Sequence, residues 1–325
     1  MKTLVMKFGG TSLADPGKLR LAAGRVKAAR RAGFAVAAVV SAPGEVTDEL
    51  LSLAAEISPR PPARELDALL SCGELMSAAL LAAALEGMGI PAVSLTGAQA
   101  GFLTDSSFGS ARVLKVSPSR LKKKLAAGRV AVVCGFQGTD RRGNITTLGR
   151  GGSDLTAVEL AHALGAESCE LLTDVKGVYS ANPALVPEAR RLKAMTYAEL
   201  ERLALFGTEV RQLRAVRRAA RLGVRLHIRS AFHREGGTLV SGKASGRRAC
   251  LSLYHGPSGP EAAVVSSGLD ADLLVSAART AGAVASRREK GTALFSPGGA
   301  GPVALIKELH SSLARAGFIG GPARD

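Results

Sequence analysis

Tryptophan is absent from this chain of 325 residues, and aromatic residues of all kinds make up only 4% of it. Apolar residues nevertheless reach 46%, which is enough for a large buried core made mostly of alanine, leucine and valine. No apolar run approaches the roughly 20 residues that cross a bilayer, and residues 1–7 lack the charged, apolar and small-residue regions of a secretory signal. The sequence therefore predicts a cytoplasmic protein without a membrane-spanning segment.

Cysteine is also scarce, and no two of the four cysteines are close enough in the sequence to form a zinc-binding pair. Buried free thiols are the favoured interpretation, because each cysteine stands beside apolar or small residues. The five histidines show no spacing typical of metal ligands either. We predict no metal site formed by protein side chains. The cysteines are Cys72, Cys134, Cys169 and Cys250.

Acidic residues, 27 in all, are outnumbered by 43 Lys and Arg, which gives a formal net charge of +16. The excess concentrates in residues 190–234, where 12 Lys or Arg accompany 3 Asp or Glu. Five of these arginines recur at spacings of three and four and share one face of a predicted helix. Such a stripe could attract nucleic acid, but no aromatic residues interleave with it for base stacking, so a solvated basic face is favoured. The five are Arg211, Arg214, Arg218, Arg221 and Arg225.

Short apolar runs typical of buried strands alternate with helical patterns through the first half of the chain. This alternation predicts an α/β fold with a largely parallel sheet and helices on both faces. In such sheets ligands bind at the carboxyl ends of the strands, where glycine-rich loops meet helix N-termini. We expect strands over residues 3–8, 35–40, 91–95, 130–135 and 170–173, and helices over 16–32, 65–87 (with a break at 72–73) and 154–165.

The composition changes past residue 241, where Gly, Ser and Lys indicate a linker. The sequence after it predicts a small α+β unit. We therefore divide the chain into a larger domain over residues 1–240 and a C-terminal unit over residues 248–325. The unit is expected to have strands over 249–254, 262–266 and 292–296, and helices over 270–281 and 302–316.

The first predicted strand ends with Lys7 and Phe8, and a turn with Gly9 and Gly10 follows it directly. A lysine at a strand end offers a mobile positive charge, and two glycines let backbone N–H groups approach an anion. Phosphoryl transfer needs such parts, because it depends on holding phosphates and neutralising charge. The chain has no G-x-x-x-x-G-K-[ST] phosphate loop and no set of protein-kinase motifs, so those two classes of ATP-using enzyme are disfavoured.

A second loop, residues 146–154, places three glycines and Arg150 directly before an amphipathic helix. Ser153 or Asp154 can cap that helix, whose N-terminal N–H groups then favour an anion. Arg150 can hold a carboxylate through two hydrogen bonds. Capping alone does not account for three glycines with an arginine among them, so we expect this loop to bind a ligand.

These two loops, KFGGTS and TTLGRGGSD, are similar to signature segments of the aspartokinases. Further segments of the same kind follow the family's order and spacing across residues 1–240. On these motifs the chain resembles the aspartokinases, which are amino-acid kinases, and residues 1–240 resemble their catalytic domain. The further segments are VVSAPGEVTD (39–48), SCGELMS (71–77), GAQAGFLTD (97–105), GFQG (135–138) and TDVKGVYSANP (173–183).

The resemblance implies transfer of the γ-phosphate of ATP, with Mg²⁺, to the β-carboxylate of L-aspartate, giving 4-phospho-L-aspartate for lysine and threonine biosynthesis. It implies that Lys7 stabilises the transferring phosphoryl group and that Asp154 orients Lys7 or that group. Glu74 would meet the ammonium group of aspartate, and Arg150 its α-carboxylate. The implied nucleotide-binding residues are Lys7, Phe8, Gly9, Gly10, Thr173, Asp174 and Tyr179, and the implied aspartate-binding residues are Ser41, Thr47, Glu74, Arg150 and Ser153.

Three positions depart from the family's pattern: Ala184 and Glu209 replace cations that contact ATP, and Phe108 replaces a common histidine. An unpaired carboxylate near a triphosphate is repulsive, although the arginine stripe follows it closely. Two functions therefore remain open. We favour an active aspartate kinase, because the catalytic and aspartate-side residues are retained; the alternative is a ligand-binding or regulatory relative with an impaired ATP site.

The C-terminal unit also departs from the family, in which two regulatory domains of the ACT type are common. Residues 248–325 have room for one such domain, and their sequence matches it poorly. The resemblance further implies a homo-oligomer with a small-molecule substrate, and neither nucleic acid nor a membrane as a partner.

Overall fold

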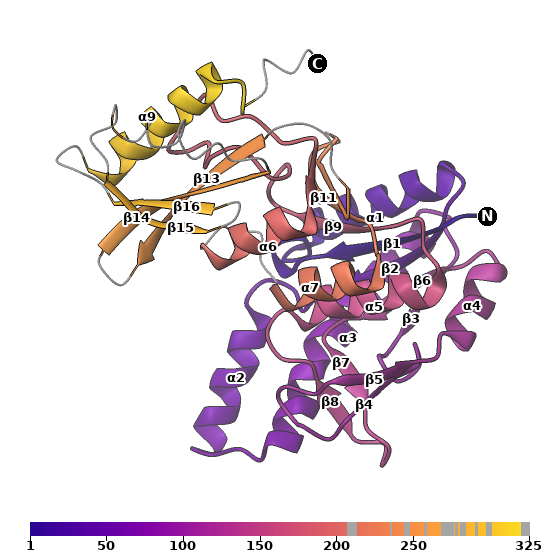
Figure 1. Ribbon diagram of the computed structural model, residues 1–325. Coiled ribbons are helices and arrows are strands. Elements are labelled where there is room, and N and C mark those ends of the chain that lie inside the picture. Colours follow the sequence, from indigo (N-terminus) through magenta and orange to yellow (C-terminus); the bar gives the residue numbers. More distant parts are fainter. Residues whose placement is uncertain are drawn as a thin grey trace. The chain divides into compact units, whose positions relative to one another are not determined.

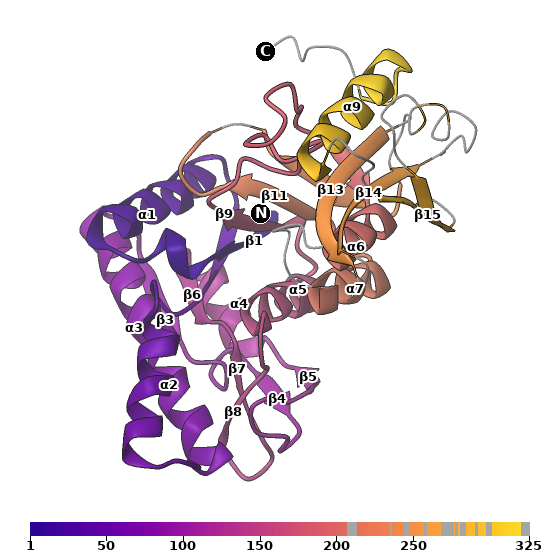
Figure 2. The ribbon, with the colours of Figure 1, turned by 90° about the vertical axis from the view of Figure 1, so that its left-hand side faces the viewer.

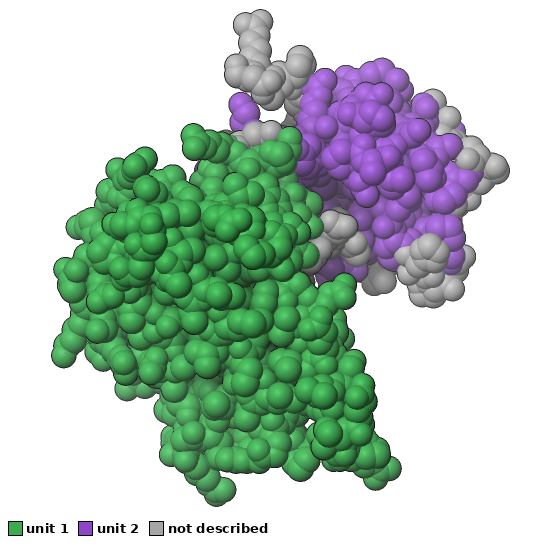
Figure 3. Space-filling model, turned by 180° about the vertical axis from the view of Figure 1, so that it is seen from behind, with its two compact units in different colours: residues 1–176, 217–236 green, residues 177–216, 237–325 purple. Residues whose placement is uncertain are grey.

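The computed structural model describes residues 1–206, 213–234, 236–243, 248–256, 259–267, 276, 279, 284–289, 292–296 and 301–319. Contacts between residues group the chain into two compact units, drawn in different colours in Figure 3. Unit 1 comprises residues 1–176 and 217–236, and unit 2 comprises residues 177–216 and 237–325. The division into residues 1–240 and 248–325, which the composition predicts, stays a prediction.

Unit 1 is built on a parallel sheet whose described strands follow the order β11-β9-β1-β2-β6-β3 (Figure 1). Two central strands, β2 (Ala35–Val40) and β6 (Val130–Cys134), are buried along their whole length. Their unbroken apolar sequences are what a parallel sheet covered on both faces requires. The other strands are β1 (Thr3–Phe8), β3 (Ala92–Leu95), β9 (Ser168–Thr173) and β11 (Leu226–Ser230).

Helices cover both faces of this sheet, and Figure 2 shows the strands between them. On one face α1 and α3 pack against alternate strand residues, among them Met6, Phe8 and Val132. The residues between these point to the opposite face, where α4 and α5 contact the strands. The predicted α/β fold is thus confirmed. The four helices are α1 (Pro16–Arg31), α3 (Ala63–Gly87), α4 (Ser119–Ala126) and α5 (Gly152–Leu164).

Residues of the local sequence fix the N-terminus of α1. Asp15 caps it by accepting a hydrogen bond from the backbone N of Lys18 at 2.8 Å, and Pro16 fills the first helical position, where no N–H is needed. Arg30 and Arg31 lie in the last turn, where their positive charges interact favourably with the negative end of the helix dipole. The cap and the proline fix the residue at which α1 begins after the turn that follows β1.

α3 runs through 25 residues without the break expected at residues 72–73. Gly73 is accommodated in it for a tertiary reason, because a Cβ at this position would lie 2.6 Å from the Cβ of Ala42. Among the described helices α3 is long and apolar enough to cross a membrane by length and composition alone. Its Leu81 and Leu85 are fully buried against the sheet, so it packs as a core helix of unit 1.

A second sheet of unit 1 has the order β5-β4-β7-β8. Its strands are three or four residues long, too short to carry a periodic pattern, so the sequence did not predict them. Both α2 and β8 contact α3. The bounds are α2 (Val46–Ile57), β4 (Phe102–Thr104), β5 (Val113–Val116), β7 (Gln137–Thr139) and β8 (Ile145–Thr147).

Unit 2 contains an antiparallel sheet in the order β13-β14-β16-β15, and α9 packs against β13 and β14. Phe295, Leu305 and Leu309 are almost fully buried in its core. The helix expected over residues 270–281 lies outside the described residues except at positions 276 and 279. The bounds are β10 (Ala194–Thr196), α6 (Tyr197–Leu205), β12 (Thr238–Ser241), β13 (Arg248–Gly256), β14 (Gly259–Ser267), β15 (Val284–Glu289), β16 (Thr292–Ser296) and α9 (Pro302–Arg315), and α7 (Leu213–Leu222) is shared by the two units.

The predicted arginine stripe is only partly helical. Arg211 lies outside the described residues, and Arg225 follows the end of α7. Arg218 reaches the carboxylate of Glu159 on α5 at 2.6 Å, and Arg225 lies 3.7 Å from Glu167. Carboxylates therefore offset part of the positive charge, which supports a solvated basic face over a nucleic-acid surface.

Candidate active site

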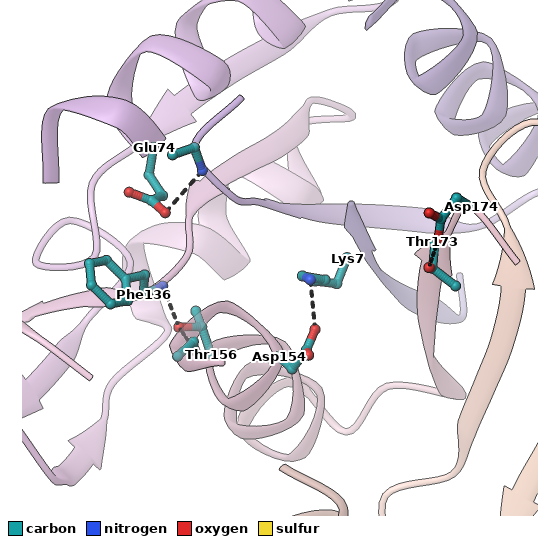
Figure 4. Close-up of polar contacts among 9 residues, drawn as sticks. Lys7, Glu74, Phe136, Asp154, Thr156, Thr173 and Asp174 are labelled. Atoms are coloured by element: carbon teal, nitrogen blue, oxygen red, sulfur yellow. Dashed lines mark hydrogen bonds and ion pairs between the residues drawn. The ribbon is translucent and has the colours of Figure 1, made fainter. Parts of the chain in front are cut away.

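An ion pair between Lys7 and Asp154 lies at the carboxyl end of β1 (Figure 4). Strand alternation turns Met6 and Phe8 toward α1 and α3, and so turns Lys7 toward α5, where Asp154 stands in the first turn. The Nζ–Oδ1 distance is 2.8 Å, and each side chain is 14% exposed. The two predicted catalytic residues are therefore brought together, with the lysine held in one direction and still open to a ligand.

The turn after β1 permits a close approach of backbone segments. A Cβ at Gly10 would lie 2.6 Å from the carbonyl oxygen of Ala42, so no other residue fits there. Gly9 donates its N–H to the carbonyl of Leu172 on β9 at 3.3 Å. A Cβ at Gly9 would lie 3.9 Å from Lys7 Nζ. The predicted glycine cradle thus joins the ends of three neighbouring strands beside the lysine.

The second glycine loop leads into α5 through left-handed backbone. Gly149 and Gly151 have φ values of 75° and 71°, and a Cβ at Gly152 would meet Leu148 and the Phe136 ring at 2.9 Å. Arg150 between them is exposed. The glycines therefore allow the loop to pack tightly, and the side chain of Arg150 remains exposed to a ligand.

The predicted capping of α5 was wrong. The helix is capped by Gly151 without a side-chain hydrogen bond, and Ser153 and Asp154 lie within its first turn. Because Asp154 is turned to Lys7 instead, the N-terminal N–H groups of α5 receive no cap from it. Within that turn the N–H groups of Gly152 and Asp154 already donate to the carbonyls of Gly149 and Gly151, at 2.8 and 3.1 Å.

Glu74 on α3 is a buried carboxylate that is only half satisfied. Its Oε1 accepts the backbone N–H of Ala42 at 3.0 Å, whereas its Oε2 is buried and has no hydrogen-bond partner in the described part of the chain. Burial raises the pKa of Glu74 to about 7, although the Ala42 hydrogen bond and the charge of Lys7 oppose this rise. An acceptor oxygen left over in a buried place fits a cation such as the ammonium group that the resemblance implies.

The other predicted aspartate-side residues lie directly after β2 and in the first turns of α2 and α5. Ser41 follows β2 directly, and its N–H donates to the carbonyl of Phe8 at 3.3 Å. Thr47 stands in the first turn of α2, and both side chains are half-buried. Ser153 is buried against Gly135, where a Cβ would come within 2.7 Å of it.

Thr173 and Asp174 end β9, and Thr173 Oγ1 donates to Asp174 Oδ1 at 2.7 Å. Tyr179, the other predicted nucleotide contact, belongs to unit 2, where its carbonyl accepts from Cys250 Sγ at 2.9 Å. The structure therefore brings together the nucleotide residues of β1 and β9, while the role of Tyr179 stays a prediction. Glu209 lies outside the described residues.

Sequence reasoning missed Asp67, a buried carboxylate on α3. It accepts hydrogen bonds from the N–H of Gly109 and from the N–H and hydroxyl of Thr147, at 2.7 to 3.0 Å. These bonds fix the end of β8, from which the loop to Arg150 departs. The available signal was an aspartate within the helical pattern of residues 65–87, but its partners are distant in the sequence.

Phe136 was also missed, although its GFQG segment was recognised. It is the one non-glycine residue with a positive φ, 65°, in the described part of the chain. Its N–H donates to Thr156 Oγ1 on α5 at 3.1 Å (Figure 4), and its carbonyl accepts from Leu148 N at 2.8 Å. Strained backbone of this kind is common beside functional sites, where surrounding contacts hold it.

Three of the four cysteines are buried, as predicted, but Cys72 is exposed on α3. Its helical position leaves it on the side of α3 turned from the sheet, which the sequence alone did not reveal. Burial raises the pKa of the Cys134 thiol to about 12, and the charge of Glu74 adds to this rise. Cys134 is therefore a neutral thiol that takes no part in charge balance.

Comparison with known proteins is consistent with this geometry. A model of the amino acid kinase family matches residues 2–230. An aspartokinase of Thermus thermophilus is 49% identical over 240 residues, covering 74% of this chain and 59% of the relative. The chain thus spans about three fifths of the length of the curated relatives it matches.

Two solved structures resemble the whole chain. Aspartate kinase from Synechocystis superposes with a TM-score of 0.68 at 33% identity, covering 99% of this chain and 57% of that one. E. coli aspartokinase III, solved with aspartate and ADP, gives a TM-score of 0.69 at 24% identity over 98% of this chain and 84% of that one. At that identity the second likeness shows the fold alone.

Proposed function

This chain belongs to the amino acid kinase family, and from that membership we propose that it is an aspartate kinase. It transfers the γ-phosphate of ATP to the β-carboxylate of L-aspartate and releases 4-phospho-L-aspartate and ADP. The observation that carries the proposal is the unpaired Oε2 of Glu74, buried at the edge of the sheet where the Lys7–Asp154 pair stands. The similar proteins support it, since they are aspartokinases and one was solved with aspartate and ADP.

Aspartate recognition needs opposite charges at the two ends of a zwitterion. Glu74 offers a buried acceptor to the ammonium group, and exposed Arg150 offers a planar pair of donors to the α-carboxylate. Hydroxyl groups are added by Ser41 after β2 and by Thr47 and Ser153 in the first turns of α2 and α5. No side chain has to act as a general base, because the β-carboxylate of aspartate is ionised near neutral pH.

Phosphoryl transfer then depends on positioned charge. Lys7 neutralises charge on the transferring group, and Asp154 fixes its ammonium in advance, so that little reorganisation is needed during the reaction. The glycine turn at Gly9 and Gly10 lets phosphate oxygens come close to the backbone, and the positive end of the α5 helix dipole favours their charge. Thr173 and Asp174 hold the base and ribose of the nucleotide.

Mg²⁺, when bound, supplies further neutralisation of the phosphates. Within the described residues there is no group of three or more His, Cys, Asp or Glu that could hold a metal ion. Asp154, the acidic side chain nearest the phosphate cradle on α5, is paired with Lys7. Mg²⁺ in ATP-using enzymes is held by the substrate phosphates with one or two carboxylates, so we propose that the ion would enter with the nucleotide phosphates.

The alternative, a regulatory relative that binds aspartate but handles ATP poorly, is favoured by one observation. Ala184 stands where aspartokinases carry an arginine, and it is exposed in a loop that Asn182 closes by accepting the N–H of Ala184 at 2.9 Å. The affinity for ATP decides between the two. A cytoplasmic homo-oligomer is part of the main proposal.

The test is ADP release from Mg·ATP with a panel of acceptors: L-aspartate, L-glutamate, N-acetyl-L-aspartate and succinate. We expect turnover with L-aspartate, and losses of a hundredfold or more with the two acceptors that lack a free ammonium group, on the order of a buried ionic contact. Turnover that does not require the ammonium group would contradict the proposal. Aspartate binding without any turnover would establish the alternative.

A further inference from the structure

Three buried polar atoms of the loop after β1 and of α3 have no hydrogen-bond partner among the residues that the structure describes: Ser12 Oγ, Glu74 Oε2 and Ser77 Oγ. The residues are 0%, 4% and 1% exposed, so solvent does not satisfy these atoms. Each orphaned polar group costs about 1–3 kcal/mol, and native structures rarely tolerate several in one region without a bound water or ligand. The group therefore requires an occupant.

All three atoms come from two elements that pack against one residue, Ala42. Glu74 accepts the N–H of Ala42, and a Cβ at Gly73 would meet its Cβ at 2.6 Å. On the other side, Gly10 approaches its carbonyl so closely that a Cβ would lie 2.6 Å away, and Ser12 follows two residues later in the same short helix, Gly10–Ser12.

Helix geometry places Ser77 over Glu74. Residues three apart share one face of an α-helix, with Cβ atoms about 5–6 Å apart. Both side chains are buried, so this face of α3 is turned into unit 1 and not to solvent. Neither Ser77 Oγ nor Glu74 Oε2 has a partner among the described residues, so the two do not bond each other directly, and one water between them would satisfy both.

The hydrogen-bonding capacity of the three groups matches one water. The ionised carboxylate oxygen accepts only, whereas each serine hydroxyl both donates and accepts. A water can donate one hydrogen to Glu74 Oε2, donate the other to one serine and accept from the second. Buried waters usually make about three such bonds.

We propose that Ser77, together with Ser12, holds one buried water against Oε2 of Glu74 and so acts as a positioning residue for recognition of the substrate's ammonium group. The inference rests on the proposed function only in its last clause. The water supplies a donor to the carboxylate, which favours the ionised form that an ammonium group needs. The hydroxyl of Ser77 thus sets how readily Glu74 is ionised.

Other groups that act on Glu74 do not replace this donor. Lys7 of β1 favours the carboxylate by its charge, but its ammonium is bound by Asp154 of α5. Cys134 of β6 is a neutral buried thiol. The N–H of Ala42 occupies the first carboxylate oxygen, and the second has lone pairs for both the water and the substrate's ammonium group.

The test is a Ser77→Ala variant with Ser71→Ala as its matched control. Ser71 is also a buried serine of α3, but its hydroxyl already donates to the carbonyl of Ala68 at 2.7 Å. The ionisation of Glu74 is followed directly by ¹³C NMR of protein labelled at the glutamate carboxyl carbon, with Glu74→Gln to identify the signal. This readout needs no enzymatic activity.

We expect Ser77→Ala to raise the titration midpoint of Glu74 by about one unit, and Ser71→Ala to leave it unchanged. In turnover assays at pH 7, Ser77→Ala should raise KM for aspartate several-fold without changing KM for ATP. Equal midpoints in wild type and Ser77→Ala would overturn the proposal. Should Ser77→Ala fail to fold, Ser12→Ala removes another partner of the same water and is expected to shift the midpoint in the same direction.

The two hypotheses fail in different ways. A shifted midpoint in a protein that neither binds nor phosphorylates aspartate would refute the proposed function and leave the water link between Ser77 and Glu74 intact. An unshifted midpoint in an active aspartate kinase would refute the water link alone.

Discussion

Lys7 and Asp154 come from a strand and a helix far apart in the sequence, and their charged atoms meet at 2.8 Å. Each side chain keeps 14% of its surface exposed, so the pair is shielded from solvent but open on one side. Partial burial makes such a pair more costly to break than a surface ion pair, because the remaining charge is left uncompensated. Asp154 therefore holds the ammonium group of Lys7 in a fixed position at the end of β1.

Replacing Asp154 by Asn removes the charge that orients Lys7 and preserves the side-chain volume. We expect kcat to fall about a hundredfold to a thousandfold, typical of losing one positioned electrostatic contact, with KM for aspartate nearly unchanged. The matched control is Glu167→Gln, which removes a carboxylate from the exposed pair with Lys2. Equal activity of the two variants would show that the Lys7–Asp154 pair has no part in transfer.

We expect Glu74→Gln to lose aspartate binding and to raise the free energy of unfolding at pH 8. The pKa of Glu74 is about 7 in the folded protein, against an ordinary value of 4.5 for a glutamate side chain. The folded state therefore binds this proton more tightly than the unfolded state does. Ionisation of Glu74 does not lower the free energy of unfolding below about pH 4.5, and it lowers it by its full amount above about pH 7. That amount is about 3 kcal/mol at pH 8, since one unit corresponds to about 1.4 kcal/mol.

Urea unfolding of wild type and Glu74→Gln at pH 5 and pH 8 measures this directly. The variant should gain little stability at pH 5 and about 3 kcal/mol at pH 8, while losing aspartate binding. A gain of the same size at both pH values would mean that ionisation of Glu74 is not its cause.

The affinity for aspartate should itself depend on pH. Since Glu74 must be ionised to meet an ammonium group, and burial raises its pKa to about 7, kcat/KM for aspartate should rise between pH 6 and pH 7.5 and then level. Lower pH protonates the carboxyl group and removes the attraction. In Glu74→Gln the low residual kcat/KM should lack this dependence; a variant that retains the wild-type profile would assign the titration to another group.

Gly135 tests the close packing between the sheet and α5. An added Cβ would lie 2.7 Å from the Cβ of Ser153 and 2.8 Å from the carbonyl oxygen of Val40, which is backbone and cannot turn away. Gly135→Ala should therefore cost about 1–3 kcal/mol of stability and displace the start of α5. The control is Gly87→Ala at the end of α3, where nothing lies within 4 Å and alanine is expected to stabilise the helix. Thermal unfolding of both variants measures the contrast.

The sequence predicted β1, β2 and α1 to within a residue, because buried parallel strands need unbroken apolar runs and α1 carries its own cap at Asp15. It was wrong about a break in α3, since the reason for Gly73 is a contact with Ala42 from another element. The three-residue strands of the second sheet escaped prediction because their pairing partners, not their own pattern, define them.

For the site, motifs indicated which residues matter but not what each one contacts. Lys7 and Asp154 were predicted separately, and only the alternation of β1 against α5 shows that they bind each other. The capping role predicted for Asp154 was wrong for the same reason. Asp67 and the strained backbone of Phe136 depend on partners far away in the chain, which no local pattern reveals.

The most direct test of the central claim compares aspartate-dependent phosphoryl transfer in wild type, Lys7→Ala and Lys18→Ala. Lys18 is a control of equal charge, since it lies on α1 beside Asp15 in an exposed pair. Hydroxylamine in the assay traps an acyl phosphate as a hydroxamate, which distinguishes transfer to aspartate from hydrolysis of ATP. Hydroxamate formed by wild type and Lys18→Ala, and reduced at least a hundredfold in Lys7→Ala, is the predicted result. Equal hydroxamate formation in all three proteins, or none in wild type saturated with both substrates, would contradict it.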